Sequence, residues 1–115
     1  MAELIISKRS EGNVTILNLN GDVTFGTGNV VLRSAIRNAL AANEKYILLN
    51  FSDVRFIDSS GVGELVSGLT AVNRENGQLK LLNLPRRVRE LLEITHLLTI
   101  FDAFENEVEA VKSFK

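Results

Sequence analysis

The stretch Phe56-Ile57-Asp58-Ser59-Ser60-Gly61-Val62-Gly63 contains the turn between a predicted strand and a predicted helix. Residues 46–51, shortly before it, form a nearly continuous apolar run, which is typical of a strand covered on both faces in a parallel sheet. After the turn, apolar side chains recur every three or four residues, at Val62, Leu65, Val66, Leu69 and Val72. We therefore expect residues 54–57 to lead into a polar turn at residues 58–61, where an amphipathic helix begins.

The chain before this turn predicts a hairpin and a first helix. Residues 4–6 and 14–19 are short and rich in strand-forming side chains, and residues 11–13 between them have turn chemistry. Residues 21–29 are predicted to be a loop, because small residues dominate them. Apolar positions on one helical face follow, at Leu32, Ala35, Ile36, Ala39 and Leu40. An antiparallel hairpin and a helix over residues 29–43 are therefore expected.

The chain after the turn repeats the pattern of strand and helix. Asn76 and Gly77 tolerate the left-handed conformation that ends helices, so the second helix is predicted to stop there. Residues 79–84 form the next apolar strand. Pro85 suits the first position of a third helix, because that position needs no amide donor. The inner face of this helix is predicted at Val88, Leu91 and Leu92.

The last segment predicts one more strand and one more helix. Residues 98–101 are interpreted as a short final strand. Asp102 and Glu105 have the spacing of a capping box, which predicts a helix start. The helix is then expected to pack through Phe104, Val108 and Val111.

Together these elements predict an α/β fold. The expected sheet is mixed: it opens with an antiparallel hairpin and continues with parallel strands that right-handed helical crossovers connect. About four helices should cover it. A chain of 115 residues is sufficient for one hydrophobic core, so residues 1–115 are assigned to a single domain. In such sheets, function concentrates at the carboxyl ends of strands, where residues 58–61 lie.

Composition excludes several classes of function. The formal net charge is −1, which argues against direct binding of nucleic acid. No apolar run approaches the roughly 20 residues of a membrane span, so no direct membrane insertion is expected. The first residues lack an export signal and the chain has no cysteine, which together favour a cytoplasmic location. With one histidine and no thiolate, neither a metal site nor a cofactor is predicted.

The residues of the turn allow two interpretations. The first amides of a helix lack internal partners and lie at the positive end of the helix dipole, so Ser59 is placed to carry a phosphate there. Alternatively, Asp58, Ser59 or Ser60 is simply an N-cap, the commonest reason for such residues before an apolar helix. The residues alone favour the cap. Three consecutive capping residues nevertheless exceed what one helix start requires.

An enzyme is not expected. Ser60-Gly61-Val62-Gly63 lacks the Gly-x-Ser-x-Gly frame of a nucleophile elbow, and the single His96 lies far along the chain and is interpreted as a helix-end or surface residue. A nucleotide-binding or weakly hydrolytic site would have to use Ser59 and the loop at residues 26–28. Neither a catalytic base nor a set of metal ligands accompanies them in the sequence.

Residues 56–63 closely resemble the anti-sigma factor antagonists, the bacterial single-domain members of the STAS family. Further similarities are the Leu-x-Leu-x-Gly pattern at residues 17–21, the strand end Leu49-Asn50-Phe51, and Asn76-Gly77 before residues 79–84. The resemblance implies that an anti-sigma factor serine kinase phosphorylates Ser59 and that a phosphatase acting on Ser59 reverses the modification. It also implies that the unphosphorylated form binds the kinase and releases a sigma factor, which regulates transcription.

A partner-binding surface is predicted near Ser59, because successive strand ends can place the loop at residues 22–29 and the turn at residues 58–61 together. Ser60 is expected to act mainly as a cap. The predicted members of this surface share a position in or beside the two loops that end neighbouring strands: Asp22, Thr24, Thr27, Asp58, Ser60, Gly61 and the exposed Glu64. Thr24 stands where many family members have an acidic residue. The alternative function within the same family is a STAS regulatory subunit of a membrane transporter or a signalling scaffold.

Overall fold

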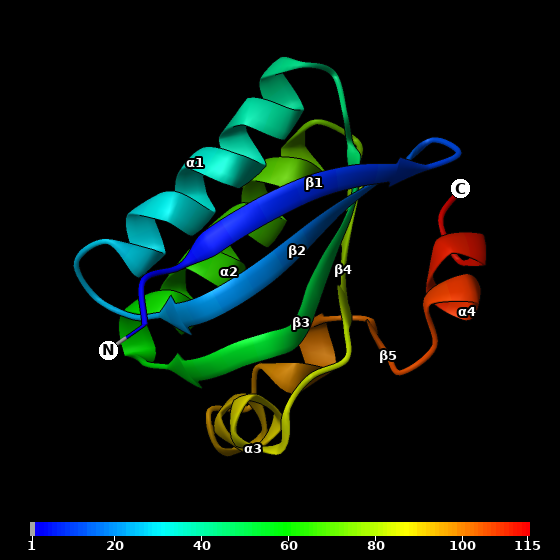
Figure 1. Cartoon of the computed structure of the whole chain (residues 1–115). Coiled ribbons are helices and arrows are strands. Elements are labelled where there is room, and N and C mark those ends of the chain that lie inside the picture. The colour runs from blue at the N-terminus through cyan, green and yellow to red at the C-terminus, as the bar shows by residue number, and fades with distance from the viewer. Residues whose placement is uncertain (1) are drawn as a thin grey trace.

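Alternating apolar strands and amphipathic helices form a five-stranded sheet with its covering helices in the computed structural model, which describes residues 2–115. Neighbours in the chain are also neighbours in the sheet (Figure 1). The elements, in chain order, are β1 (Ile5–Glu11), β2 (Val14–Val23), α1 (Gly28–Ala41), β3 (Tyr46–Ile57), α2 (Ser59–Arg74), β4 (Gln78–Leu82), α3 (Arg86–Ile94), a 3-10 helix (Leu98–Ile100), β5 (Ala103–Phe104) and α4 (Glu107–Lys112).

The predicted mixed sheet is confirmed. β1 pairs with β2 antiparallel, through a turn in which Gly12 has a φ of 61°. β2, β3, β4 and β5 are parallel neighbours. Because successive crossovers advance in one direction along the sheet, α1 and α2 lie on the same face. Within residues 2–115, four α-helices accompany the five strands, as the sequence pattern predicts.

β2 and β3 are longer than the sequence predicts. The expected loop at residues 21–29 was wrong in its first part, because β2 continues to Val23 and pairs there with Ile57 of β3. Gly21 marks an irregularity inside the strand: it has a φ of 124°, and its backbone passes so close to Glu3 that no Cβ would fit. A small residue inside a strand can mean such a close approach as well as a loop.

The helix ends follow the sequence closely, with one displacement. Asn76 has a φ of 60°, and the Gly77 amide donates to the Val72 carbonyl at 3.0 Å, which ends α2 as predicted. Pro85 lies just before α3 and not at its first position, since its ψ of 156° is extended. His96 is exposed directly after α3 with a φ of 60°, which confirms it as a helix-end residue.

The last segment differs from its prediction. Residues 98–100 form the 3-10 helix, and the final strand is β5, whose Phe104 carbonyl accepts the Asn83 amide at 2.8 Å. The capping box predicted from Asp102 and Glu105 was wrong, because Ala103 and Phe104 between them form β5. Asn106 caps α4 instead, accepting the Glu109 amide at 3.0 Å. Val111 packs from the last helix as expected, Phe104 packs from β5 and not from that helix, and Val108 is 61% exposed.

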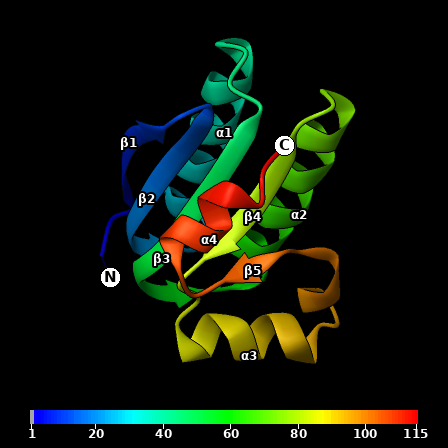
Figure 2. The same ribbon diagram turned by 90° about the vertical axis from the view of Figure 1, so that its right-hand side faces the viewer.

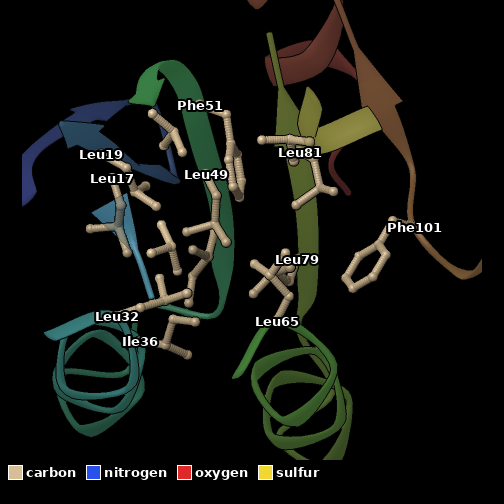
Figure 3. Packing of buried hydrophobic residues seen from close by; sticks show 14 of the residues in the cluster. Leu17, Leu19, Leu32, Ile36, Leu49, Phe51, Leu65, Leu79, Leu81 and Phe101 are labelled. Carbon is tan, nitrogen blue, oxygen red and sulfur yellow. The ribbon is translucent and has the colours of Figure 1, made fainter. Parts of the chain in front are cut away.

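Each face of the sheet has its own apolar cluster. The larger cluster joins one face of the sheet to α1, α2 and α3 (Figure 3). Its central side chains are fully buried, at Leu32, Ile36, Leu49, Phe51, Leu65 and Leu81. The smaller cluster lies under α4 on the opposite face (Figure 2). Among the residues described, no helix combines the length and the apolar character that crossing a membrane requires.

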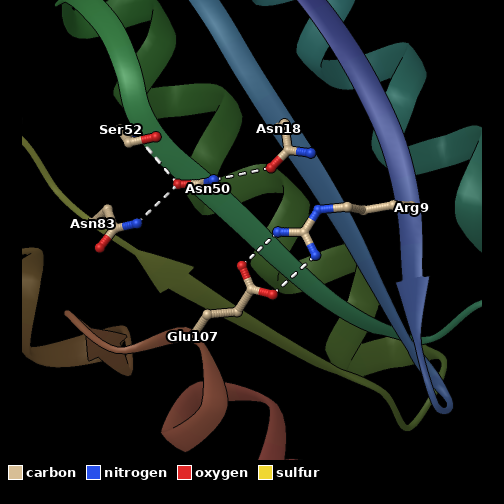
Figure 4. Close-up of polar contacts among 6 residues, drawn as sticks. All are labelled: Arg9, Asn18, Asn50, Ser52, Asn83 and Glu107. Atoms are coloured by element: carbon tan, nitrogen blue, oxygen red, sulfur yellow. Dashed lines mark hydrogen bonds and ion pairs between the residues drawn. The ribbon is translucent and has the colours of Figure 1, made fainter.

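The face under α4 also carries a polar ladder across three strands (Figure 4). The side-chain amide of Asn50 donates to Asn18 at 2.9 Å, and its carbonyl oxygen accepts from Asn83 at 3.3 Å. Arg9 of β1 pairs with Glu107 of α4 through two hydrogen bonds. The pair of Arg9 and Glu107 joins α4 to β1, whereas the asparagine side chains link neighbouring segments of the sheet.

Candidate functional site

Two loops meet at the edge of the sheet where β2 and β3 end. Val23 and Ile57 are paired in parallel register, so the segments that follow them leave the sheet side by side. One segment is the β2–α1 loop, residues 24–27, and the other is the short turn through Asp58 into α2. The prediction that these two segments lie together is confirmed, and parallel pairing is its cause.

Asp58 is the N-cap of α2. Its Oδ1 accepts the amides of Ser60 and Gly61, each at 3.0 Å, and the hydroxyl of Ser60 at 2.6 Å. The expectation that Ser60 itself acts mainly as the cap is therefore wrong. A carboxylate one residue before the helix reaches these amides directly, and the Ser60 hydroxyl stabilises that carboxylate.

The second oxygen of Asp58 holds the neighbouring loop. Asp58 Oδ2 accepts the backbone amide of Phe25 at 2.9 Å, and the Asp58 amide donates to the Val23 carbonyl at 3.4 Å. Asp58 thus caps one helix and fixes the loop that leads into another. Sequence reasoning placed Asp58 in the site, but local spacing carries no signal for a bond across 33 residues.

The hydrogen bonds around Asp58 keep it ionised. Burial by itself raises the pKa of this carboxyl, but the Ser60 hydroxyl and the amides of Phe25, Gly61 and Ser60 outweigh burial and lower the pKa below its ordinary value. A carboxyl with a depressed pKa in the folded state contributes stability above its unfolded pKa, and that contribution is lost as the pH falls through the folded pKa.

We predict that Asp58→Ala destabilises the protein by about 0.5–2 kcal/mol at pH 7, the usual worth of an N-cap, and by less near pH 3. The cause is protonation of Asp58 in the wild type, which removes the charge that the four donors stabilise. Urea unfolding at both pH values measures the change. Asp58→Asn is the control: neither Asn nor Ala titrates, so their difference in stability should not depend on pH. A constant gap between wild type and Ala would contradict the prediction.

Ser59 is presented to solvent at the first turn of α2. It is the first helical residue and is exposed, and within residues 2–115 no hydrogen bond engages its hydroxyl. The neighbouring Ser60 is half-buried and its hydroxyl is engaged with Asp58. Of the two adjacent serines, Ser59 is therefore the one whose hydroxyl another protein can reach.

The β2–α1 loop adds an exposed aromatic ring, at Phe25, next to the Asp58 turn. Phe25 is 80% exposed although its amide is fixed by Asp58. Thr27 is exposed and Thr24 is half-buried, as candidate contacts require. Sequence reasoning included this loop but missed Phe25. The sequence did contain a signal: an aromatic residue stands next to glycine in a segment of small residues. That segment lacks the apolar periodicity that predicts a buried side chain.

The prediction that Asp22 contacts a partner needs correction. The Asp22 side chain is 2% exposed and its Oδ2 accepts the Ala2 amide at 2.9 Å, so it cannot touch a partner directly. Its carbonyl lies against Gly28, where a Cβ would overlap it. Asp22 therefore shapes the start of the β2–α1 loop from beneath. An acidic residue beside a loop looks exposed in the sequence, because the contact with the distant amino-terminal segment is not visible there.

Glu64 also differs from its predicted exposed state. Its side chain is only 11% exposed and pairs with Arg33 of α1, accepting from Nε at 3.1 Å. The hydrogen bond and the charge of Glu64 raise the pKa of Arg33. Because the pair joins α1 to α2, charge reversal at Glu64 would disturb the packing of two helices.

The chain belongs to the STAS domain family, whose profile matches residues 6–110. It is 27% identical over 109 residues to the anti-sigma F factor antagonist of Paenibacillus polymyxa, covering 94% of this chain and 92% of that protein. It is 30% identical over 95 residues to the anti-sigma-B factor antagonist of Bacillus subtilis, covering 83% and 84%.

The fold also has a solved counterpart. The crystal structure of an anti-sigma factor antagonist from Mycobacterium paratuberculosis superimposes with a TM-score of 0.85 at 17% identity, over 96% of this chain and 93% of that one. At that identity the likeness concerns the fold. The resemblance identified in residues 56–63 is thus confirmed at the level of the family, across nearly the whole chain.

Proposed function

We propose that this chain is a cytoplasmic anti-sigma factor antagonist, a regulatory protein and not an enzyme, that is switched by phosphorylation of Ser59. One observation carries the proposal: Ser59 is exposed at the start of α2, while the adjacent Ser60 hydroxyl is engaged with Asp58. The two relatives named as antagonists of anti-sigma factors support the regulatory role. The unphosphorylated form binds an anti-sigma factor that is also a serine kinase and thereby releases a sigma factor.

The partner-binding surface in this proposal is centred on Ser59. It combines the exposed residues Phe25 and Thr27 with the first turns of α2, where Gly63 is exposed and has open space beside its Cα. Phe25 is the expected anchor, because exposed aromatic side chains that become buried contribute heavily to interfaces. Asp58, Ser60 and Gly61 support the surface by fixing its backbone, and the half-buried Thr24 lies at its margin.

Phosphorylation changes the charge of this surface without a matching cation on the same loops. A phosphoserine adds about 1.5 to 2 negative charges at neutral pH. The charge would stand beside the ionised Asp58, which already takes the amides of Ser60 and Gly61. The dipole of α2 favours the phosphate, but the amides of Ser60 and Gly61 at the helix start already donate to Asp58. A partner that fits the neutral serine would therefore meet an uncompensated charge, and a phosphatase acting on Ser59 would restore binding.

The proposal is tested by mapping the phosphorylated residue. We expect the cognate anti-sigma factor kinase and ATP to modify this chain at Ser59 alone, as read by mass spectrometry of its peptides. Ser59→Ala should abolish incorporation of phosphate. Ser60→Ala, the matched control, should remain a substrate because it retains the exposed hydroxyl. Modification at Ser60 or Thr24 with none at Ser59 would rule the proposed switch out.

A further inference from the structure

We infer that Asp58 couples phosphorylation of Ser59 to the position of Phe25, so that the switch releases the β2–α1 loop in addition to adding charge. This inference rests on the proposed phosphorylation of Ser59. Asp58 acts as a positioning residue in it: it holds the Phe25 ring in place through a backbone hydrogen bond and does not itself need to touch the partner.

The carboxylate of Asp58 divides its two oxygens between the two segments. Oδ1 receives three donors from the first turn of α2: the Ser60 and Gly61 amides at 3.0 Å and the Ser60 hydroxyl at 2.6 Å. Oδ2 receives the Phe25 amide at 2.9 Å. The first three donors follow Asp58 by two or three residues, so helix geometry presents them. The fourth comes from another element and depends on how the loop lies.

The β2–α1 loop has little else to hold it. Its remaining hydrogen bonds, from Asn29 to the Thr24 carbonyl at 3.0 Å and from Val31 to the Thr27 carbonyl at 2.9 Å, join it only to its own helix. In the part of the chain described, the bond from Phe25 to Asp58 is the one hydrogen bond between residues 24–27 and another element. The Phe25 ring, 80% exposed, provides no packing that would replace it.

The chain can move at this point without a steric barrier. Gly26, directly after Phe25, has a φ of 105°, and open space surrounds its Cα. Glycine occupies both positive and negative φ at low cost, so the backbone beside Phe25 can change direction. By contrast, Gly28 is packed against the Asp22 carbonyl and keeps the start of α1 in place. A change of direction at Gly26 would therefore be confined to residues 24–27.

A phosphate on Ser59 is expected to break the weaker of the contacts that Asp58 makes. Its negative charge repels the Asp58 carboxylate from the adjacent position, and its oxygens compete for nearby amide donors. The three donors of the first helical turn keep Oδ1 in place. The single long-range donor, the Phe25 amide, is the contact that yields. Released, the loop no longer presents the Phe25 ring in the geometry that the partner fits.

Amide exchange measured by NMR on the 15N-labelled full chain tests this coupling. Phosphoserine is installed at position 59 during synthesis, so the test does not depend on any kinase. We expect phosphorylation to speed exchange of the Phe25 amide with water by about tenfold or more, because a hydrogen-bonded amide becomes open. The Val31 amide, bonded within α1, should change little and serves as the internal control.

Asp58→Asn separates the two tasks of the carboxylate. Asparagine is an equally good N-cap, but its single carbonyl oxygen cannot serve both segments. We expect Asp58→Asn to keep a melting temperature near that of the wild type and to expose the Phe25 amide before any phosphorylation. Phosphorylating this variant should then add little to Phe25 exchange.

Two results would overturn the coupling: a Phe25 amide that phosphorylation leaves protected in the wild type, or a phosphorylation effect of equal size in Asp58→Asn. The wild-type comparison decides the matter even where the variant is poorly folded. The proposed function fails on a different result, namely a kinase that does not modify Ser59. That result would not affect the measured influence of an installed phosphoserine on exchange of the Phe25 amide.

Discussion

Ser59→Asp is expected to lower the affinity for the anti-sigma factor kinase by about a hundredfold or more, which corresponds to about 2.7 kcal/mol. The new carboxylate adds a second negative charge next to the ionised Asp58, in the centre of the proposed partner-binding surface. An unpaired or repelled charge at an interface costs several kcal/mol. Titration calorimetry of the variant and the wild type against the kinase measures the loss.

The same substitution should leave the fold nearly unchanged. Position 59 is exposed at the first turn of α2, where the helix dipole favours a negative charge by about 0.3–1 kcal/mol. Repulsion from Asp58 opposes that gain, so the melting temperature should shift little. Ser59→Ala is the matched control and should bind like the wild type. Wild-type affinity in Ser59→Asp, or a loss of binding that merely follows unfolding, would exclude an electrostatic switch at Ser59.

The position of the site could be predicted because it follows from local rules. An apolar run predicts a buried strand, capping residues predict a helix start, and parallel strands place successive loops at one edge of the sheet. These rules brought Ser59 and Thr27 to neighbouring loops, and the register of Val23 with Ile57 confirms the juxtaposition. The polarity of residues 58–61 identified the turn, although not which side chain caps the helix.

What could not be predicted depends on contacts between distant residues. Asp22 is acidic and lies near a loop, yet the Ala2 amide and the surrounding backbone bury it. Glu64 is withdrawn from solvent by Arg33, 31 residues away in the chain. Phe25 is 80% exposed although aromatic side chains are usually buried, and its amide is held by Asp58, 33 residues away in the chain. Each outcome depends on a contact with a distant residue of the same chain, which sequence spacing does not specify.

The carboxyl-terminal segment shows the same limit for secondary structure. Residues 102–105 have the spacing of a capping box, a preference worth about 1 kcal/mol. Pairing of β5 with β4 satisfies two backbone donors, the Leu81 amide to Asp102 at 2.9 Å and the Asn83 amide to Phe104 at 2.8 Å. Tertiary pairing therefore prevails over the local preference, and the helix begins later, at the cap that Asn106 provides.

Gly61→Ala is expected to destabilise the protein by about 2 kcal/mol or more, with a fall in melting temperature of about 8 °C or more. Gly61 packs directly against the end of β2: a Cβ there would overlap the Val23 carbonyl oxygen and lie 2.8 Å from Ile57 Cγ1. Backbone cannot yield as a flexible side chain does. The first turn of α2 must therefore move away from β2, which also strains the hydrogen bonds that Asp58 receives.

Gly63→Ala provides the matched control, two residues further along the same helix. Its Cβ would meet open space, so the substitution should stabilise α2 by about 0.5–1 kcal/mol through the lower conformational entropy of the unfolded chain. Thermal unfolding of both variants compares a clash with a pure propensity change at nearly the same position. Equal or higher stability of Gly61→Ala relative to the wild type would mean that α2 does not pack tightly against the end of β2, because that contact is what makes a methyl group at position 61 unfavourable.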